Sequence, residues 1–492
     1  MSRFSSTLFH TAVYMAGLIL NRGVAFLLVP LFTRIFTPEA FTKWDLCTTT
    51  LILLFPVLDL GMSPAVVRIY HDHESEKDRG RVFSTGLLFV LAAHVLIVGA
   101  GFLFARPLAA MIFRDAADAD LVRIVFLSAA VTAYGKQALS LLRTMQRSVL
   151  FSMLNLVRGV AGPLAILLLV AWLGQGVAGA LWGDLFGLTV LAAAALWVCR
   201  GHLRPEFSPG MLRSLLAFGL PTIPMSVTVG ILTVADRYFL ARMFTLEEMA
   251  PYSLGFKIGT LMALFTQSIQ LSWPPAAFAM ILRPDGKAEI ARAAHWLNLL
   301  MFFCATGVTC AAPELLRIFA PAEGYAGALG IIPWIAYSYA VHGAVQVVNI
   351  GIGISKRMAW AAAATCGAAA AKIAVTYWFI VHFGLAGAAV STLAAFGLEL
   401  LLTWVIAQHI VHPLPFDTKR MLGLYALSGA ALAASFPLFT LPYAWSLPAR
   451  GLLLAVFALA CLFGLLNRAD RAALAHAGQA LARKARGRVS GG

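Results

Sequence analysis

Long apolar runs separated by short polar clusters extend along almost the whole chain. Most runs are about 20 residues long, which is the length that an α-helix needs to cross the apolar core of a bilayer. The pattern predicts an all-α polytopic membrane protein with about fourteen membrane-spanning helices. These cover residues 8–33, 43–67, 82–105, 121–142, 148–173, 176–198, 212–241, 249–279, 293–312, 326–351, 357–381, 384–409, 420–441 and 446–466.

Two short phrases occur twice at the same spacing. Residues Arg34–Glu39 read Arg-Ile-Phe-Thr-Pro-Glu, and Arg242–Glu247 read Arg-Met-Phe-Thr-Leu-Glu, so the offset is 242 − 34 = 208. Ala-Gly-Ala at 178–180 recurs at 386–388 with the same offset. A constant offset indicates a duplicated half. Each half holds six predicted spans, an even number, so both halves enter the membrane in the same orientation and are related by an axis along the membrane normal.

The duplication predicts how the chain is divided. We expect an N-terminal six-helix lobe over residues 1–205 and a C-terminal six-helix lobe over residues 206–412, arranged around a central cavity. An additional helix pair follows at residues 413–467, and a basic tail at residues 468–492. The tail fits either a flexible topology signal or a segment that contacts anionic lipid headgroups.

Composition excludes a soluble fold. The chain has 492 residues, of which 60% are hydrophobic and 12% charged, and its mean hydropathy is +0.83. A soluble protein cannot bury so much apolar surface. The net charge of +15 would suggest nucleic acid in a soluble chain, but here Lys and Arg gather in the loops after even-numbered spans. Because such loops are cytoplasmic, we expect both termini in the cytoplasm and no nucleic-acid partner.

No sequence motif indicates an enzyme. The chain lacks a P-loop, a Gly-x-Ser-x-Gly motif and any run with metal-ligand spacing, and its six cysteines occur singly. We therefore predict no catalytic residue, no metal site and no cofactor. Without a nucleotide site, we expect an electrochemical gradient of H⁺ or Na⁺ to drive any transport cycle.

Basic residues at membrane depth are the clearest candidates for a binding site, because an ionisable group there must be paired or hydrated. Arg22, Arg158, Lys257 and Lys372 all lie inside predicted spans. A hydrated cavity between the halves, lined by such residues, would attract an anion such as a phosphate or a pyrophosphate. Arginine holds phosphate oxygens in a bidentate manner, and lysine adds a mobile point charge.

Acidic residues at similar depth are candidates for proton or sodium coupling. They are Asp59, Asp184, Asp236 and Glu399. Simple ion pairing between helices is the alternative explanation for each of them. In that case Arg158 would pair with Asp184, and Lys372 with Glu399, and neither cation would be available to a substrate.

Other polar residues in the apolar runs fit structural roles. Arg237 stands beside Asp236, and we expect it to be structural near the outer interface. His94, His295 and His342 also lie in apolar runs. A hydrogen-bonded interior histidine is favoured over a proton relay for these three.

Four segments of the chain resemble a known family. They are "NRGVAFLLVPLFTRIFTPEAFTKWDL" at 21–46, "LDLGMSPAVVR" at 58–68, "LLRTMQRSVLFSMLNLVRGV" at 141–160 and "ADRYFLARMFTLEEMAPYSLGFKIGTL" at 235–261. The first resembles the opening hairpin of bacterial polysaccharide (O-antigen type) flippases, and the others resemble later parts of the same proteins. That family belongs to the multidrug/oligosaccharidyl-lipid/polysaccharide (MOP) exporter superfamily. The similarity covers most of residues 1–410.

The resemblance implies a V-shaped pair of lobes and a defined activity. Such a protein would move an undecaprenyl-pyrophosphate-linked oligosaccharide from the cytoplasmic to the periplasmic leaflet by alternating access, for cell-surface polysaccharide synthesis. It would reside in the bacterial inner membrane among lipids, with a glycan polymerase and glycosyltransferases as candidate partners. Arg22 occupies a first-helix position where such flippases can carry a cavity-facing basic residue. The alternatives are a multidrug exporter of the same superfamily and a non-transporting component of a glycan-assembly complex.

Overall fold

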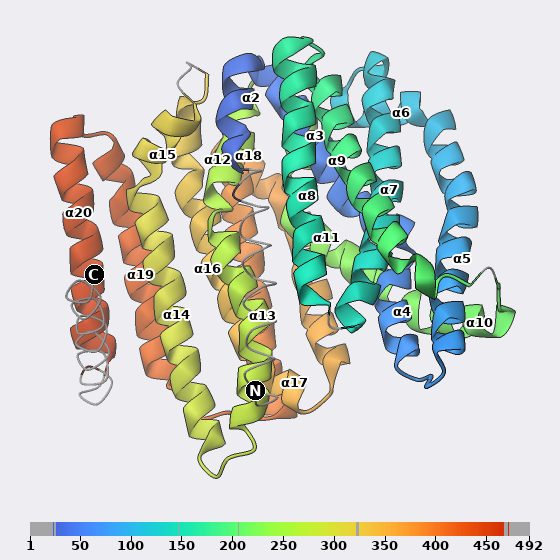
Figure 1. The fold of residues 1–492 in the computed structure, drawn as a ribbon. Helices are drawn as coiled ribbons and strands as arrows, with labels where there is room; N and C mark the ends of the chain where they lie inside the picture. The colour runs from blue at the N-terminus through green and yellow to red at the C-terminus, as the bar shows by residue number, and fades with distance from the viewer. Residues whose placement is uncertain are drawn as a thin grey trace, which may run out of the picture.

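The computed structural model describes residues 23, 26–145, 147–204, 206–320, 324–466 and 471, and this part of the chain is built from helices joined by short turns (Figure 1). Ten helices within these residues are long and apolar enough to cross a membrane. The predicted all-α polytopic fold is confirmed. The count of fourteen spans stays a prediction, because most of the first span lies outside the described residues.

The helices of the first half follow the predicted spans closely. They are α2 (Val29–Ile35), α3 (Pro38–Asp59), α4 (Met62–Tyr70), α5 (Glu76–Leu103), α6 (Ala105–Phe113), η1 (Ala116–Asp118), α7 (Ala119–Thr144), α8 (Ser148–Ile166), η2 (Leu167–Trp172), α9 (Gly176–Cys199) and η3 (Arg200–His202). The second predicted span consists of two helices, since the chain adopts left-handed backbone angles at Leu60 and Gly61, between α3 and α4.

The second half repeats this order of elements. Its helices are α10 (Pro209–Gly219), α11 (Thr222–Met243), α12 (Ala250–Gly259), α13 (Met262–Met280), α14 (Gly286–Cys310), α15 (Ala312–Phe319), η4 (Ala326–Gly330), α16 (Ile332–Val348), α17 (Ile350–Ile354), α18 (Met358–Val405) and η5 (Ile406–Val411). The additional helix pair follows as α19 (Thr418–Phe439), α20 (Tyr443–Ala460) and η6 (Cys461–Leu465). The short helix and 3₁₀ turn α6–η1 recur as α15–η4. The long helix α18 bends at Gly384, where the backbone leaves helical angles.

The duplicated phrase forms the same kind of joint in both halves. Each copy begins at the end of one helix, and its threonine makes hydrogen bonds in the segment that leads into the next helix. Thr37 accepts a hydrogen bond from the Ala40 amide at the start of α3, where Pro38 occupies the first helical position. In the second copy, Thr245 and Glu248 exchange side-chain and backbone hydrogen bonds of 2.8 Å and 3.3 Å before α12. These contacts satisfy amide groups at the start of α3 and in the turn before α12, which explains why both copies keep the threonine.

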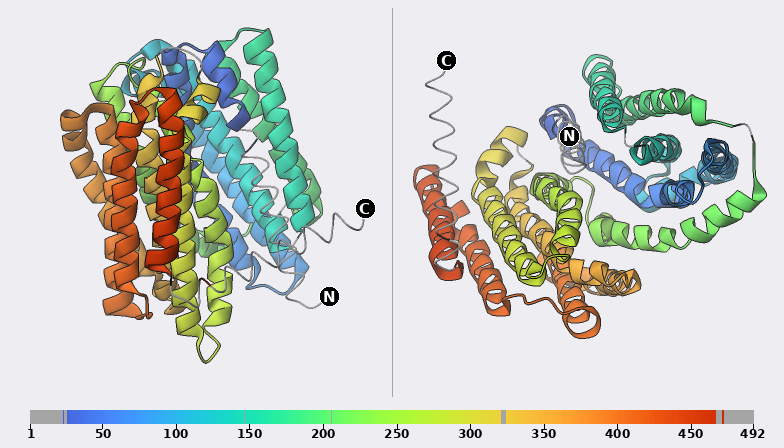
Figure 2. Two further views of the ribbon diagram at one scale, coloured as in Figure 1. Left: turned by 90° about the vertical axis from the view of Figure 1, so that its left-hand side faces the viewer. Right: turned by 60° about the horizontal axis from the view of Figure 1, so that its bottom comes forward.

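The helices form two groups that lie side by side (Figure 2). The blue to teal helices α3–α9 lie on one side, and we call them the N-terminal lobe. The C-terminal lobe comprises α11–α18, and the pair α19–α20 packs against its helix α14. Helix α10 follows the predicted boundary at residue 206, yet it packs against α4 and α5 of the N-terminal lobe. A Cβ on Gly61 would overlap the Gly219 carbonyl, so glycine is required at this contact. The domain limits themselves stay a prediction.

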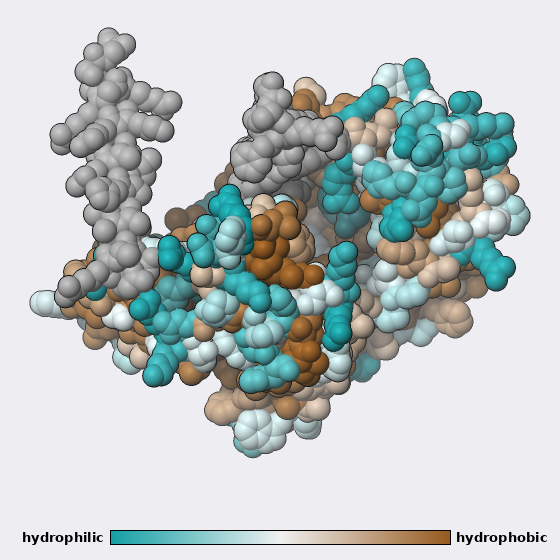
Figure 3. Space-filling view, turned by 90° about the horizontal axis from the view of Figure 1, so that it is seen from below, coloured by the Kyte–Doolittle hydropathy of each residue, from teal (hydrophilic) through white to brown (hydrophobic). Residues whose placement is uncertain are grey.

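The two lobes are in close contact on the upper side of the view in Figure 1. One buried apolar cluster there contains Ile112 and Val122 of the N-terminal lobe together with Leu240 and Leu246. The Thr33 hydroxyl also donates to the Phe319 carbonyl across the interface. Seen from below, the surface is hollowed between the lobes (Figure 3). The lobes are therefore closed against each other above and separated below.

Candidate functional site

A polar cavity of about 360 Å³ lies where the two lobes meet. Helix α3 contributes one wall, and α11, α12, α13 and α16 contribute the others. Its polar lining includes Asp45, Arg237, Lys257, Gln267, Gln270 and His342. Since α3 belongs to the N-terminal lobe and the other helices to the C-terminal lobe, any movement of one lobe against the other changes this cavity.

Three charged residues in this cavity link the lobes, and we call them the interlobe cluster: Asp45, Arg237 and Lys257. The Asp45 carboxylate accepts a hydrogen bond of 2.8 Å from Arg237 Nε and lies 2.7 Å from Lys257 Nζ. Both cations also lie over aromatic rings. Arg237 is 3.8 Å from the ring centre of Phe256, and Lys257 is 4.1 Å from that of Trp44. The electron-rich faces of these rings attract the two cations.

Local sequence places each member of the cluster. Asp45 lies two turns into α3, so the capping of that helix at Thr37 fixes its height. Lys257 occupies the last turn of α12, where the free carbonyls favour a positive charge. That helix ends at Gly259, and the hydroxyl of the next residue, Thr260, donates to the Lys257 carbonyl at 2.7 Å. The helix break thus presents the lysine to the cavity.

The charges of the interlobe cluster do not balance. Two cations share one carboxylate, and Asp45 itself is only 1% exposed. Within the described residues, Arg237 Nη1 is buried and has no hydrogen-bond partner. A buried donor without a partner is costly, and so is an uncompensated charge. An anion that supplied acceptor oxygens and one negative charge would satisfy both the unpartnered donor and the excess charge.

Lys372 has a different environment from the one expected for a cavity residue. Its side chain is fully buried, and Nζ donates to the Leu232 carbonyl at 2.6 Å and the Thr392 hydroxyl at 3.0 Å. The nearest carboxylate is Asp236 at 3.5 Å, not Glu399. The second Asp236 oxygen accepts from the Tyr252 hydroxyl. This set, which we call the Lys372 cage, joins α11, α12 and both halves of α18 and lies outside the cavity lining.

Of the remaining candidate residues, some make structural contacts and one lies outside the described residues. Arg158 and Asp184 lie 3.6 Å apart, as the pairing alternative predicted, and about a third of each side chain is exposed. Asp59 accepts from the Ser63 amide at 3.2 Å and from its hydroxyl, so it caps the start of α4. Arg22 lies outside the described residues. A role in binding or coupling stays a prediction for each of the eight candidate residues.

Glu399 lies near the cavity residue His342. One carboxylate oxygen of Glu399 accepts from the Thr365 hydroxyl at 2.8 Å, and the other lies 3.6 Å from His342 Nδ1. His94 is a hydrogen-bonded interior histidine, as expected, with partners Tyr134 and the Leu58 carbonyl at 2.8 Å each. Among the described residues, no group of three or more His, Cys, Asp or Glu side chains could hold a metal ion.

Sequence reasoning missed two members of the interlobe cluster. Asp45 was not a candidate, and Arg237 lines the cavity although its neighbour Asp236 suggested a structural role at the outer interface. The available signal was spacing. On α3, Thr48 and Thr49 lie three and four residues after Asp45, so all three share one face of the helix. On α13, Gln267 and Gln270 are three residues apart and also share a face. A polar stripe on an apolar span indicates a wet cavity more directly than single charges do.

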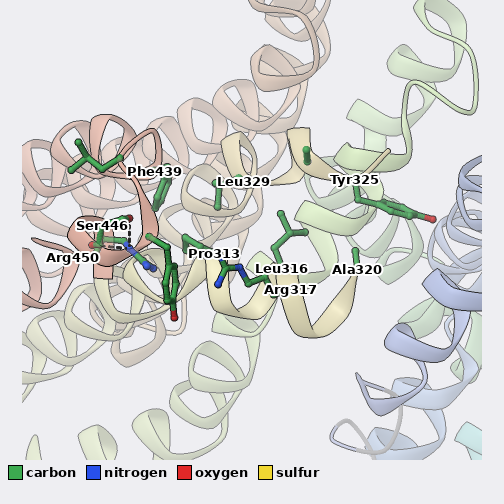
Figure 4. Close-up of a pocket in the computed structure, with 12 residues that line it drawn as sticks. Pro313, Leu316, Arg317, Ala320, Tyr325, Leu329, Phe439, Ser446 and Arg450 are labelled. Atoms are coloured by element: carbon green, nitrogen blue, oxygen red, sulfur yellow. Dashed lines mark hydrogen bonds between the residues drawn. The ribbon is translucent and has the colours of Figure 1, made fainter. Parts of the chain in front are cut away.

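A second pocket, of about 310 Å³, lies between α15, η4 and the turn from α19 to α20 (Figure 4). Arg450 of α20 is buried at one end beside Ser446. Its guanidinium binds both oxygens of Glu314, at 2.6 Å and 2.7 Å, and also donates to the Cys310 carbonyl. This Arg450–Glu314 clamp holds the pKa of the Glu314 carboxyl below its usual range. It ties the additional helix pair to the C-terminal lobe.

Two lobes of apolar helices around a charged cavity define a polytopic membrane protein with the fold of MOP transporters. The sequence model of the family described as "Polysaccharide biosynthesis protein" matches residues 8–280, more than half of the chain. The chain belongs to this family, as the resemblance of its hairpins suggested.

Individual relatives agree with this assignment. The chain is 25% identical over 227 residues to the lipid III flippase of Escherichia coli (strain K12), a match that covers 45% of this chain and 53% of the relative. The match thus spans about half the length of that curated relative. The relative is a flippase and not an enzyme, in agreement with the absence of a catalytic motif.

Solved structures share the fold. The lipid II flippase MurJ in its inward closed conformation superimposes with a TM-score of 0.67 at 14% identity, over 92% of this chain and 96% of its own. A multidrug resistance MATE family transporter of the MOP superfamily, in an inward-facing conformation, superimposes with a TM-score of 0.59 at 15% identity. That match covers 79% of this chain and 93% of the other.

Proposed function

We propose that this protein is a flippase for a lipid-linked glycan, and that the cations of the interlobe cluster bind the phosphate or pyrophosphate that joins glycan to lipid. The observation that carries the proposal is the excess of one positive charge beside a polar cavity between the lobes. The names of its relatives, which flip lipid II and lipid III, support the same class of substrate.

The chemistry of such a substrate fits the cavity. A pyrophosphate offers several acceptor oxygens and would meet the unpartnered Nη1 of Arg237 and the ammonium of Lys257. Gln267 and Gln270 offer amide groups for sugar hydroxyls. The lipid chain would remain in the bilayer, since transferring it through a polar cavity would expose apolar surface. One lobe moving against the other would then expose the cavity to each leaflet in turn.

The substrate would be an undecaprenyl-pyrophosphate-linked repeat unit, moved from the cytoplasmic to the periplasmic leaflet of the inner membrane. The loops rich in Lys and Arg lie on the lower side of Figure 1, and such loops face the cytoplasm. Both termini would then be cytoplasmic as well. The hollow on that side would admit substrate from the cytoplasmic leaflet. The glycan polymerase and the glycosyltransferases of the same pathway remain candidate partners.

A flipping assay in proteoliposomes tests this proposal. The purified protein is reconstituted with an undecaprenyl-pyrophosphate-linked oligosaccharide, and an impermeant glycosidase reports which leaflet holds the sugar. We expect wild-type protein to expose the sugar on both sides and Lys257→Met to do so far more slowly. Arg158→Met is the matched control, since Arg158 is an intramembrane cation outside the cavity lining. No movement by wild-type protein would contradict the flippase, and equal movement by Lys257→Met would contradict the cationic site.

The likeness to multidrug transporters supports a second candidate, a drug exporter. Asp45 would then be the binding group, because a carboxylate attracts cationic drugs. The two cations already bound to Asp45 disfavour this reading. Efflux of a cationic dye from a drug-sensitive host that expresses the protein distinguishes the two: the flippase proposal predicts no efflux above that of an empty vector.

A further inference from the structure

The pocket between α15, η4 and the turn from α19 to α20 contains a cation that the proposed transport function does not use. Arg317 of α15 lies in its wall, and the Arg317 guanidinium points toward that of Arg450 on the opposite side (Figure 4). Arg317 lies over the ring of Tyr443, 4.1 Å from the ring centre. The ring attracts the guanidinium but does not neutralise its charge. In the described part of the chain, Arg317 forms no ion pair with a carboxylate.

The carboxylate of Glu314, one turn before Arg317, is already engaged. Its two oxygens accept hydrogen bonds from Arg450 at 2.6 Å and 2.7 Å. The Tyr443 hydroxyl also donates to this carboxylate. Glu314 therefore balances Arg450 and leaves the charge of Arg317 uncompensated. Among the described residues, two guanidinium groups and one carboxylate give this pocket an excess of one positive charge.

The depth of the pocket in the membrane indicates what kind of anion it meets. Leu441, Tyr443 and Trp445 in the turn from α19 to α20 are all exposed. Exposed Trp and Tyr beside apolar residues are typical of the headgroup level of a bilayer. Leu316 and Phe439 form an apolar part of the pocket wall. A ligand there meets a cation and apolar side chains together, which suits a phosphate that is attached to a lipid.

The size and charge of the pocket favour an anionic phospholipid. Ligand pockets begin at about 300 Å³, and this one encloses about 310 Å³, so it suits a small headgroup better than an oligosaccharide. The single excess charge matches a headgroup with one negative charge, such as that of phosphatidylglycerol. A zwitterionic headgroup would bring its own ammonium close to the two guanidinium groups, and like charges repel.

The duplicated half provides an internal contrast. Helices α6 and α15 share the pattern Pro-x-x-x-x-Ile-Phe, at residues 107–113 and 313–319. In this alignment Arg317 corresponds to Met111, which carries no charge. The uncompensated arginine is therefore a feature of the half to which the additional helix pair is attached.

We propose that Arg317, beside the Arg450–Glu314 clamp, binds the headgroup phosphate of an anionic phospholipid. The phosphate pairs with the Arg317 guanidinium, and the acyl chains lie along the apolar wall formed by Leu316 and Phe439. One lipid then bridges α15 and the additional helix pair, on the outer-leaflet side in the orientation proposed above. This site is separate from the interlobe cluster and does not depend on flipping.

Brominated phospholipids test the site, because bromine on an acyl chain quenches the fluorescence of a nearby tryptophan. The purified protein in detergent is titrated with brominated phosphatidylglycerol or brominated phosphatidylcholine. The signal of Trp445 is obtained as the difference between wild type and Trp445→Phe. We expect phosphatidylglycerol to quench Trp445 at a concentration about tenfold lower than phosphatidylcholine, the effect of one charge-assisted pair. Equal quenching by the two lipids would overturn the proposal.

Substitutions assign the preference to Arg317. Arg317→Met, which places at this position the residue type of Met111, should abolish the preference for phosphatidylglycerol, whereas Arg317→Lys should retain most of it. Arg106→Met is the matched control, because Arg106 is an exposed arginine of α6 on the same side of the molecule (Figure 1). A preference that survives Arg317→Met, or that Arg106→Met also abolishes, would refute the assignment.

Farnesyl pyrophosphate distinguishes a phospholipid from a prenyl-linked phosphate. It is added as an unlabelled competitor against brominated phosphatidylglycerol, in parallel with unlabelled phosphatidylglycerol. We expect farnesyl pyrophosphate to displace the brominated lipid no better than phosphatidylglycerol does. Stronger displacement would assign the pocket to the prenyl lipid and overturn the phospholipid site. Because these measurements need no transport, a failure of the flipping assay would leave their outcome unchanged.

Discussion

The interlobe cluster and the Arg450–Glu314 clamp use the same chemistry for different ends. Both place a buried cation against a carboxylate. In the clamp one guanidinium faces one carboxylate through two hydrogen bonds, and its remaining donors reach backbone and Ser446. In the cluster two cations share Asp45, and Arg237 keeps a donor free within the described residues. A balanced and saturated pair holds helices together, whereas an unbalanced one beside a cavity can bind a ligand.

Removing the only carboxylate of the cluster is expected to have the largest effect. Asp45→Ala leaves Arg237 and Lys257 facing each other without a counter-charge between the lobes. Breaking a buried pair in this way costs about 4 kcal/mol. We expect a marked loss of thermal stability in detergent, measured by the temperature of unfolding, and partial recovery with Asp45→Glu. A variant as stable as wild type would mean that Asp45 does not balance the cluster.

Neutralising the clamp is expected to cost somewhat less. Glu314→Gln leaves Arg450 buried without its partner, but Glu314 is 31% exposed, so water can replace part of the interaction. We expect a loss of about 3 kcal/mol of stability. Because the pKa of Glu314 is lowered in the folded protein, the stability from this pair is present above the ordinary glutamate range and is lost as pH falls through the lowered pKa.

The two sites then differ in function as well as in stability. At a temperature where it remains folded, Glu314→Gln should flip lipid at the wild-type rate, since the clamp lies within one lobe and its associated helix pair. Arg450→Met combined with Glu314→Gln should regain stability, because no uncompensated charge remains. Impaired flipping in a folded clamp variant would show that the helix pair takes part in transport.

Lys257→Met is expected to affect transport more than folding. Asp45 retains Arg237 as a partner, so the pair that remains is balanced. The site loses its excess charge and one charged hydrogen bond to the anion, which is worth about 2 kcal/mol, or roughly a 30-fold change in affinity. The flipping assay should show a loss of that order with little change in unfolding temperature. An unchanged flipping rate would place the anion elsewhere, with Arg22 as the next candidate.

The sequence predicts the fold of this protein far better than the contacts of its charges. Apolar runs follow from bilayer thickness, and the 208-residue offset follows from duplication, so both can be read along the chain. The partners of Lys257 and Lys372 cannot. Asp45 reaches Lys257 across 212 positions, and Lys372 binds Asp236 of another helix instead of Glu399 on its own. Such partners depend on how the lobes and helices meet.

The Arg158–Asp184 pair marks the limit of what proximity in sequence could predict, and its loss should have the smallest effect. The two residues stand on consecutive helices, α8 and α9, which pack closely, and each side chain is about one-third exposed at a separation of 3.6 Å. Pairs with such access contribute at most about 1 kcal/mol. Arg158→Ala and Asp184→Ala should therefore each leave the unfolding temperature and the flipping rate close to wild type, and the double variant should differ little from either. Arg158→Ala could instead show a strong flipping defect that Asp184→Ala does not share. That result would mean that Arg158 contacts the substrate along its path. The cations that bind the substrate would then not be confined to the interlobe cluster.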